Sequence, residues 1–289
     1  MKFEKMDDFV QKMVTIYFPK YANIRDYSRK KGKKIDLDNP QTYSEKIRYI
    51  MLHSKGNRLM TLCADKYNVR KLLERKQMDF LLNELYGVYD CFDDINFDLL
   101  PDKFVLKCTH GSSYNIICSN KNTFDKESAK AKIGKWQKEN YGYKYGEYFY
   151  CAIRPRIICE KYLEDAKGEL LDYKIHCFGG TPKMIQVDFD RNTGKRHTRN
   201  FYDTNWNKIP VSVLYPRNKE RELSKPKYLE KMLGYAEILS KDFPMVRVDF
   251  YYLDEKIIFG EMTFAHGCGL EKITPVRFDR VWGSWIHLS

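Results

Sequence analysis

Two acidic residues, Asp249 and Glu261, lie in neighbouring runs rich in β-branched and aromatic residues and are the first candidates for chemistry. The runs Met245–Leu253 and Lys256–Phe264 are joined by an acidic dipeptide, which predicts a β-hairpin. Both acids lie at comparable distances from the turn, so their carboxylates meet across the pair if they point to one face. Converging carboxylates repel unless a cation lies between them, and Mg²⁺ is commonly held by one or two carboxylates and substrate phosphates. The hairpin is therefore a candidate floor of a nucleotide site, and the competing interpretation is a solvated hairpin whose acids face water.

A small polar turn, Gly111 to Ser113, separates the predicted strands Phe104–Cys108 and Asn115–Cys118. A Gly-Ser-Ser turn presents backbone N–H groups and two hydroxyls to phosphate oxygens, and Lys107 adds a positive charge at the end of the preceding strand. Most Gly-Ser turns after a strand are only turns, and the Gly-Lys-Ser/Thr sequence of a Walker loop is missing.

A third candidate is Glu160, which ends the predicted strand Arg156–Glu160 and precedes Lys161-Tyr162-Leu163. Its carboxylate and the backbone groups that follow are suited to an adenine amino group and ring edge. The competing interpretation is a strand-end acid paired with a lysine.

The elements that position these groups change in character along the chain. The first hundred residues are mainly helical in pattern, and from Lys103 onward strands, loops and helices alternate, which predicts an α+β or α/β domain. The predicted helices are Met1–Tyr21, one that begins at Thr42 or Ser44, Asn57–Lys76 with Asp65-Lys66 inside it, Phe124–Lys138, and Pro226–Lys241. Asp172–Phe178 and Pro182–Phe189 are predicted strands, and Arg191–Ile209 is predicted to be a loop.

Charge and cysteine content narrow the class of protein. The net charge of +12 favours an anionic partner: a nucleotide, a nucleic acid, an anionic polysaccharide or an anionic membrane face. No nucleic-acid-binding module is recognisable, so no nucleic acid partner is expected. The densest basic cluster, Arg29 to Lys34, is interpreted as a solvated loop. Eight scattered cysteines without a C-x-x-C pair, and the absence of a signal-peptide core or a long apolar run, predict a cytoplasmic protein.

The order of these motifs resembles that of ATP-grasp enzymes. More closely, the chain resembles the TupA-like ATP-grasp family of bacterial cell-surface polysaccharide loci, members of which are often labelled glycosyltransferases. The resemblance runs from about Pro40 to the C-terminus and is carried by EKIRYI, ADKYNVR, LPDKFVLKCTHGS, RPRIICEKYL, DYKIHCF, RNFYDTNW, RVDFYY, GEMTFAHGCGLEKI and GSWI.

The resemblance implies an α+β, ATP-grasp fold in which two α+β subdomains enclose the nucleotide, preceded by a mainly helical region. The boundaries expected are a helical region at 1–102, a small or lid subdomain at 103–163, and a large subdomain with the metal-binding hairpin at 164–289.

The resemblance also implies roles for individual residues. It implies that Lys66 and Lys107 contact the phosphates of ATP and that Gly111, Ser112 and Ser113 form a flexible loop over these phosphates. It also implies that Glu160 and Leu163 lie at the adenine hinge. It assigns Mg²⁺ to Asp249, Glu261 and Thr263, and it implies that Arg247 lies near the acyl phosphate and is catalytic together with Lys107. Thr263 is a departure, since the family of ligases commonly has Asn there and a hydroxyl coordinates Mg²⁺ less effectively than an amide oxygen.

The function implied is an ATP- and Mg²⁺-dependent ligase that activates a carboxylate, such as a uronic acid of a capsular or other surface polysaccharide, and joins it to an amine or amino acid. Contact with a membrane-bound, lipid-linked glycan belongs to the same hypothesis. Basic and aromatic residues suited to an acidic sugar are Lys174, Arg199, Tyr202 and Trp206, with His266 and Gly267 in the loop that replaces the usual Pro-Gly.

Three alternatives stay open at the level of sequence. The first is a phosphotransferase that moves the γ-phosphate of ATP to a sugar hydroxyl. The second is a glycosyltransferase, although the Asp-x-Asp runs Asp36–Asp38 and Asp188–Asp190 lie outside the matched metal strands. The third is a non-catalytic nucleotide- or glycan-binding module, which the Thr263 departure keeps open.

Overall fold

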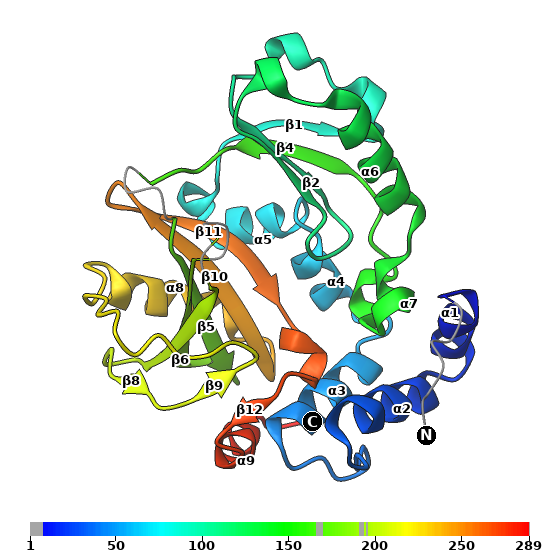
Figure 1. The fold of residues 1–289 in the computed structure, drawn as a ribbon, viewed down its shortest axis with the longest axis vertical. Helices are drawn as coiled ribbons and strands as arrows, with labels where there is room; N and C mark the ends of the chain where they lie inside the picture. The colour runs from blue at the N-terminus through cyan, green and yellow to red at the C-terminus, as the bar shows by residue number, and fades with distance from the viewer. Residues whose placement is uncertain (1–7, 166–169, 191–193, 195, 289) are drawn as a thin grey trace. The chain divides into compact units, whose positions relative to one another are not determined.

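The computed structural model describes residues 8–165, 170–190, 194 and 196–288 of the 289-residue chain (Figure 1). The described residues fall into two compact units. The first unit comprises Met1–Lys34 and Met51–Leu163, and the second comprises Ile35–Ile50 and Glu164–Ser289. The division into 1–102, 103–163 and 164–289 stays a prediction. Helices combined with antiparallel sheets confirm the predicted α+β class.

The first unit is built on a four-stranded antiparallel sheet in the order β1-β4-β2-β3. Its strands are β1 (Leu85–Tyr89), β2 (Phe104–Cys108), β3 (Asn115–Cys118) and β4 (Ile157–Lys161). Phe104, Leu106 and Cys108 of β2 and Ile133 of α6 are buried in one apolar cluster. The hairpin of β2 and β3 has the bounds that the sequence predicts.

In the described part of the first unit, helices precede and interrupt the strands, and α6 packs against the sheet (Figure 1). They are α1 (Asp8–Tyr17), α2 (Pro19–Lys31), α4 (Arg58–Ala64), α5 (Val69–Arg75), α6 (Lys126–Lys138) and α7 (Tyr141–Tyr145). Five 3₁₀ turns lie between the helices and strands of the described part of this unit: η1 (Asp79–Leu81), η2 (Phe92–Asp94), η3 (Phe97–Leu99), η4 (Lys121–Thr123) and η5 (Tyr148–Tyr150).

The predicted single helix Asn57–Lys76 is wrong, because the chain breaks into α4 and α5 at Asp65. The Asp65 carboxylate accepts hydrogen bonds from the backbone N–H groups of Tyr67 (2.8 Å) and Asn68 (3.0 Å). A side chain that accepts from backbone groups two and three residues ahead starts a new helix and competes with continuation of the old one. Asp65 and Lys66 therefore lie in a turn between two helices.

Two predictions near the N-terminus also need correction. The predicted helix Met1–Tyr21 is two helices in the described residues, since α1 ends at Tyr17 and α2 begins at Pro19, while residues 1–7 lie outside the described part. The basic run is not a loop throughout, because Arg29 to Lys31 form the last turn of α2. Basic side chains favour a helix C-terminus, and Gly32, with φ of 69°, ends the helix in the left-handed region.

The second unit is built on a six-stranded antiparallel sheet in the order β11-β10-β5-β6-β7-β8. Its strands are β5 (Asp172–Phe178), β6 (Thr181–Phe189), β7 (Thr198–Asp203), β8 (Lys208–Ile209), β10 (Met245–Leu253) and β11 (Lys256–Thr263). A small sheet pairs β9 (Ser212–Val213) with β12 (Ile273–Thr274). The remaining elements are α3 (Tyr43–His53, in this unit as far as Ile50), α8 (Leu229–Ser240), η6 (His266–Gly269) and α9 (Arg277–Ser284).

The predicted loop Arg191–Ile209 is wrong over much of its length, because residues 198–203 form β7 and 208–209 form β8. Residues 191–193 and 195 lie outside the described part of the chain. β7 has the sequence TRNFYD and four consecutive buried residues. Burial on both faces removes the alternation of polar and apolar residues that identifies a half-exposed strand.

The second unit closes around residues far apart in the sequence. The Asp279 carboxylate of α9 accepts a hydrogen bond from the Ser44 backbone N–H at the start of α3 (2.8 Å), and Lys46 donates to the carbonyl of Ile286 (2.7 Å). Trp282 is buried against Tyr43 and Phe201. Within the described residues, no helix is both long and apolar enough to cross a bilayer.

Candidate functional site

The predicted hairpin forms, with the expected bounds for β10 and with β11 ending at Thr263, one residue before the predicted end, and it contains one irregularity. Leu253 pairs with Lys256 across the turn, and regular pairing continues to Phe250 opposite Phe259. The register then shifts by one residue, so that Asp249 pairs with Glu261 rather than with Gly260. Gly260 is thus the extra residue of a β-bulge.

The bulge brings the two acids together. Without it, Asp249 would lie opposite Gly260, and Glu261 would point to the other face, because neighbouring residues of a strand alternate between faces. Cross-strand partners share a face, so the observed register places the carboxylates of Asp249 and Glu261 side by side. The sequence signal that was missed is a glycine inside a strand, a frequent mark of a bulge.

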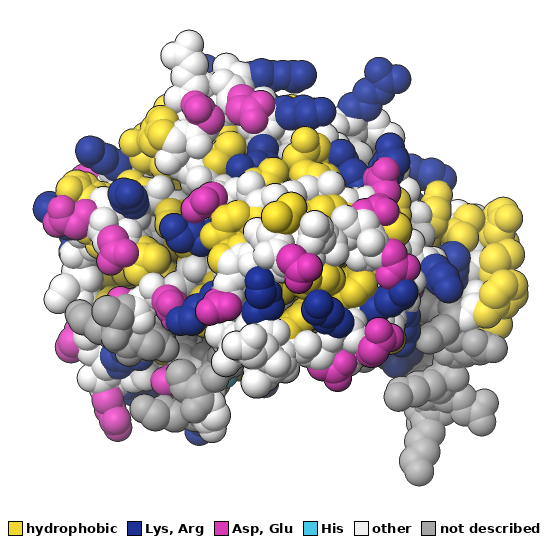
Figure 2. All heavy atoms as spheres, turned by 90° about the horizontal axis from the view of Figure 1, so that it is seen from above, with side chains coloured by type: hydrophobic (Ala, Val, Ile, Leu, Met, Phe, Trp, Pro, Cys, Tyr) yellow, Lys and Arg dark blue, Asp and Glu magenta, His cyan; other side chains and the backbone are white. Residues whose placement is uncertain are grey.

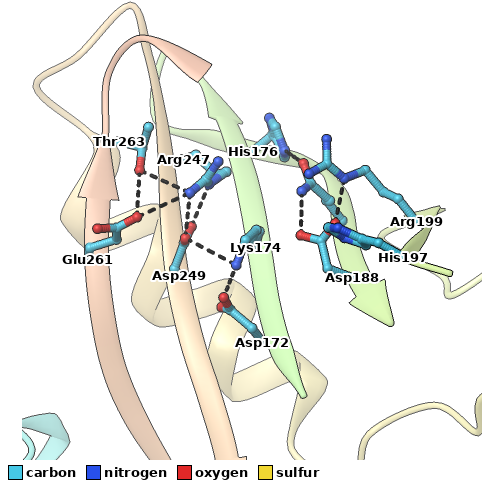
Figure 3. Close-up of polar contacts among 11 residues, drawn as sticks. Asp172, Lys174, His176, Asp188, His197, Arg199, Arg247, Asp249, Glu261 and Thr263 are labelled. Atoms are coloured by element: carbon cyan, nitrogen blue, oxygen red, sulfur yellow. Dashed lines mark hydrogen bonds and ion pairs between the residues drawn. The ribbon is translucent and has the colours of Figure 1, made fainter. Parts of the chain in front are cut away.

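Arg247 lies between these acids (Figure 3). Its guanidinium donates to both carboxylate oxygens of Asp249, from Nε to Oδ1 (2.7 Å) and from Nη2 to Oδ2 (2.6 Å). The same Nη2 reaches Glu261 Oε1 (3.3 Å) and the Thr263 hydroxyl (3.1 Å), and that hydroxyl donates to Glu261 Oε1 (3.3 Å). In this structure, the cation between the converging carboxylates is therefore a side chain.

The two acids beside Arg247 differ in burial. Burial alone would raise the pKa of the Asp249 carboxyl, but the charges of Arg247 and Lys174 outweigh it and the pKa lies below its usual value. The Glu261 side chain is 40% exposed, against 4% for Asp249. Glu261 Oε2 makes no hydrogen bond to any other described residue and is the accessible oxygen of the pair.

Lys174 extends the network along the same face of the sheet (Figure 3). It lies directly opposite Asp249 on β5, with 3.6 Å between its Nζ and Asp249 Oδ2, and it also donates to Asp172. All three side chains are buried. The predicted substrate residue Lys174 is thus held between two carboxylates.

A second buried network follows on β6 and β7 (Figure 3). The Gln186 amide connects His176 Nε2 (3.2 Å) to Asp188 Oδ2 (2.9 Å), and Asp188 Oδ1 accepts from Arg199 Nε (2.6 Å) and contacts His197 Nε2 (3.0 Å). Burial followed by the charge of Arg247 lowers the pKa of His176 to about 3, so its ring is neutral. Arg199, predicted to contact substrate, is paired with Asp188 and lies 3.5 Å from Glu271 Oε2, and the sequence analysis did not predict either pairing.

The predicted aromatic residues of the substrate region stack on each other. The rings of Tyr202 and Trp206 lie 4.2 Å apart with 7° between their planes, and Trp206 Nε1 donates to the carbonyl of Leu223 (2.9 Å). Tyr202 is buried, whereas Trp206 is half-buried. The stack fixes the end of β7, and only Trp206 retains an accessible edge.

The loop after β11 contains His266 and Gly267. His266 is buried, lies edge-on to His176 at 5.0 Å between ring centroids, and has its Nε2 3.6 Å from Glu271 Oε2. Burial and the neighbouring His176 and Arg247 lower the pKa of His266 well below its usual value. Gly267 has a φ of 54°, and a Cβ there would lie 2.3 Å from Glu271 Cγ, so this position needs glycine.

The predicted nucleotide residues of the first unit form a separate set of contacts. Lys107 Nζ contacts Glu160 Oε2 (2.6 Å), and Arg70 Nη1 contacts Glu160 Oε1 (3.3 Å). Leu163 is half-buried, beyond the end of β4. The predicted phosphate lysine and the predicted hinge acid are therefore paired with each other, and Arg70 is a third member that the sequence analysis missed.

The predicted phosphate loop is held by Lys66. Its ammonium donates to the Gly111 carbonyl, and its backbone N–H donates to Thr109 (3.3 Å). A Cβ on Gly111 would lie 2.8 Å from the rings of Tyr114 and Tyr141, which explains the glycine. Ser112 is half-buried and Ser113 is exposed with a φ of 61°. Lys66 and the serines thus lie at one loop.

The donor set of the hairpin fits Mg²⁺ only together with other oxygen ligands. No group of three or more His, Cys, Asp or Glu side chains in the described part of the chain is arranged to hold a metal. Glu261, Asp249 and the Thr263 hydroxyl provide hard oxygen donors, and Mg²⁺ usually completes its shell with waters and substrate phosphates. Glu261 is the best placed of these donors, because Arg247 already occupies both oxygens of Asp249.

A cavity of about 410 Å³ lies beside β7 and β8, at the edge of the second unit's sheet opposite the hairpin. Its polar lining comprises Asn200, Lys208, Arg217, Asn218, Lys219 and Glu222, and the Lys208 ammonium is paired with the Glu222 carboxylate (2.6 Å). Asn218 is fixed to β7 by two hydrogen bonds of 2.9 Å with Asn200. Among the described residues, the side chains of Arg217 and Lys219 have no acidic partner, so the cavity has basic side chains to offer an anion.

The sequence of the chain matches a known family over most of its length. The model of the TupA-like ATPgrasp family matches residues 45–287. No curated protein sequence matches the chain.

Several solved structures are similar in fold. D-alanine--D-alanine ligase from Bacillus anthracis has 17% sequence identity and a TM-score of 0.41, and the match covers 70% of this chain and 57% of that one. N5-carboxyaminoimidazole synthase from Aspergillus clavatus, in complex with ADP and 5-aminoimidazole ribonucleotide, has 10% identity and a TM-score of 0.41, with coverage of 72% and 45%. The chain thus spans about half the length of these proteins.

Proposed function

Because this chain belongs to the TupA-like ATPgrasp family, with the ATP-grasp fold expected from its sequence, we propose that it is an ATP- and Mg²⁺-dependent carboxylate–amine ligase that forms ADP. The observation that carries the proposal is the bulged pairing of Asp249 with Glu261 beside Arg247 on β10 and β11. Two acids and a guanidinium on one face suit a reaction in which negative charge is transferred between oxygens.

The proposed reaction has two steps. A carboxylate oxygen of the acid attacks the γ-phosphorus of ATP, the bond from that phosphorus to the bridging oxygen breaks, and ADP leaves. The amine then attacks the acyl carbon, phosphate departs with the carbon–oxygen bonding pair, and the amine nitrogen releases a proton. No side chain acts as a nucleophile.

The residues divide between binding and charge stabilisation in this proposal. Lys66 and Lys107 hold the ATP phosphates, with the loop of Gly111, Ser112 and Ser113 over them and Glu160 and Leu163 beside the adenine. Asp249, Glu261 and Thr263 hold Mg²⁺, which when bound neutralises phosphate charge. The guanidinium of Arg247 is held by two hydrogen bonds to the Asp249 carboxylate. In this proposal that fixed orientation lets Arg247 stabilise negative charge on the acyl phosphate.

We propose an acidic sugar, such as a uronic acid of a surface polysaccharide, as the carboxylate substrate and an amino acid or another amine as its partner. Arg217 and Lys219 in the lining of the cavity support an anionic substrate. Arg199 and Lys174 then act by positioning, since both are already paired with buried acids. His266 and Gly267 shape the loop next to the reacting acids.

We also propose that the reaction takes place in the cytoplasm of a bacterium and supplies a capsule or a similar glycan, including one carried on a membrane lipid. All eight cysteines are free thiols, which supports a reducing compartment.

The proposal is tested by incubating the protein with ATP, Mg²⁺ and panels of uronic acids and amines, with mass detection of products and separate quantification of ADP, AMP and UDP. A ligase releases ADP and phosphate only with an acid and an amine, or slowly with the acid alone as the acyl phosphate hydrolyses. Hydroxylamine in place of the amine converts an acyl phosphate to a hydroxamate.

Other outcomes identify the alternatives. A stable phospho-sugar without hydroxamate would replace the ligase by a phosphotransferase. UDP release from a sugar donor without ATP would replace both by a glycosyltransferase.

A further inference from the structure

Large hydrophobic side chains are exposed on α1 and at the start of α2. Six of them, between 36 and 66% exposed, lie within a short stretch of the chain: Phe9, Val10, Met13, Tyr17, Phe18 and Tyr21. We call this set the apolar row. Figure 2 shows hydrophobic side chains gathered at the right-hand edge of the molecule, where α1 lies in Figure 1. Contiguous exposed apolar residues mark interaction surfaces, because isolated ones are the norm on soluble domains.

The apolar row is the outward side of helices that are anchored by their other side. Phe9, Met13 and Tyr17 are four residues apart, which stacks their side chains along one face of α1. On the inward side Thr15 is buried, and its carbonyl accepts a hydrogen bond from the Tyr148 hydroxyl (2.9 Å). The first unit therefore fixes the helices and leaves the row accessible.

Positive charge surrounds the apolar row. Between residues 8 and 34 the chain has eight Lys or Arg against two Asp, a net charge of +6 and half of the +12 of the whole chain. Asp26 is already paired with Arg25 (2.7 Å). The exposed basic residues of this stretch are Lys12, Lys20, Arg29, Lys30, Lys33 and Lys34.

We propose that α1 and α2 dock the protein on an anionic lipid bilayer, with the apolar row in the interfacial layer and the basic residues against lipid headgroups. Aromatic side chains and Lys or Arg on one amphipathic helix are the combination that favours the membrane interface. Anionic headgroups attract such a basic segment within a Debye length.

The docking proposal goes beyond the ligase reaction and does not depend on it. It rests on exposure and charge in the first unit, and its test needs neither ATP nor turnover. A protein that failed as a ligase would still bind vesicles, and one that failed to bind vesicles would still be open to test as a ligase.

The experiment is sedimentation of the full chain with vesicles of phosphatidylglycerol and phosphatidylcholine in equal parts, and with vesicles of phosphatidylcholine alone. The protein sediments with the anionic vesicles, less with the neutral ones, and less as salt is raised. Replacing three row residues together, Phe9→Ser, Tyr17→Ser and Phe18→Ser, weakens binding roughly tenfold or more. A charge variant, Lys30→Glu, Lys33→Glu and Lys34→Glu, loses the preference for anionic vesicles.

Each variant has a matched control in the same unit. Phe80→Ser removes an aromatic ring that is 64% exposed elsewhere, and Lys132→Glu, Lys135→Glu and Lys138→Glu reverse three exposed charges on α6. Both controls bind vesicles as the unmodified protein does. Because all these side chains are exposed, circular dichroism shows the same folded signal for every variant.

Three results would overturn the docking proposal. The first is no sedimentation with anionic vesicles. The second is equal loss of binding in the controls and in the row and charge variants. The third is self-association in lipid-free solution that the row variant abolishes, which would make this face a contact between copies of the chain.

Discussion

The Lys107–Glu160 ion pair of the first unit is partly open to water, whereas the pairs that Arg247 and Lys174 form in the second unit are enclosed. The Lys107 side chain is 25% exposed and shares Glu160 with Arg70. Lys107 would therefore give up a single ion pair in order to contact a phosphate. Arg247 and Lys174, by contrast, are buried together with Asp172 and Asp249 on neighbouring strands. Charges that can exchange partners suit ligand binding, and charges that are fixed in place suit stabilisation of a transition state.

The same contrast shows which charged groups are costly for the stability of the fold. A buried charge without a partner is strongly destabilising, so the acids of the second unit serve the fold as well as the chemistry. A partly exposed ion pair contributes less to stability, because water already solvates part of it. Substitutions in the enclosed network of the second unit should therefore affect stability and turnover, and substitutions at Lys107 and Glu160 of the first unit should affect nucleotide affinity.

The largest effect is expected for stability at Asp249. Asp249→Asn removes the negative charge between Arg247 and Lys174 and should destabilise the protein by about 3–5 kcal/mol, the cost of breaking a buried pair. Urea unfolding measures this cost. Glu84→Gln, which removes an exposed acid near Lys161, should cost less than about 1 kcal/mol. Equal costs for the two variants would mean that the enclosed network does not support the fold.

The next effect concerns turnover at the accessible acid. Glu261→Gln keeps the volume of a side chain that is 40% exposed, so the protein should fold while turnover falls about a hundredfold or more. Glu160→Gln in the first unit should instead raise the ATP concentration that gives half-maximal turnover and leave the rate at saturating ATP nearly unchanged. A loss smaller than about tenfold in Glu261→Gln would remove the hairpin as the metal site.

A smaller effect is expected for nucleotide affinity at Lys107. Lys107→Ala should weaken ATP binding by one to two orders of magnitude, about 1.5–3 kcal/mol for a charge-assisted contact. Calorimetric titration measures it directly. Lys161→Ala, on the same sheet and exposed, is the matched control and should bind ATP normally. Unchanged affinity in Lys107→Ala would place the nucleotide elsewhere.

The smallest effect is a dependence of stability on pH in the second unit. The folded state lowers the pKa of His176 to about 3, so in the window between that value and the usual pKa near 6.5 the unfolded chain binds the extra proton. The contribution of His176 to the free energy of unfolding is therefore complete above about pH 6.5. Below that pH it decreases by about 1.4 kcal/mol per pH unit. His176→Gln should make the unfolding midpoint less sensitive to pH between 7 and 5. The same slope in both proteins would rule out His176 as its source.

Much of the fold could be predicted because local patterns agree with it. Both hairpins have strands rich in β-branched and aromatic residues with short polar turns, and the predicted strand bounds are confirmed for β2, β3 and β10. The family and the ATP-grasp fold expected from the motif order are confirmed by the match over residues 45–287. Local signals were therefore sufficient for these strands, whose composition alone distinguishes them from the polar turns beside them.

Other features depend on contacts that no short window contains. β7 was missed because its buried partners, among them Asp188 for Arg199, come from another strand. The bulge at Gly260 was missed because a strand pattern does not reveal register. The break at Asp65 was missed because its carboxylate competes with helical hydrogen bonds. The assigned roles of the site residues stay predictions.

The division between nucleotide binding and chemistry is tested most directly at Arg247. Hydroxamate formation and ATP affinity are measured for Arg247→Ala, and for Arg247→Lys as a variant that keeps the charge, with a uronic acid that supports ADP release. We predict that hydroxamate formation falls about a hundredfold in Arg247→Ala while the Kd for ATP changes less than about threefold, because Arg247 stabilises charge only during transfer. Loss of ATP affinity in parallel with hydroxamate formation, or full hydroxamate formation without the guanidinium, would contradict it.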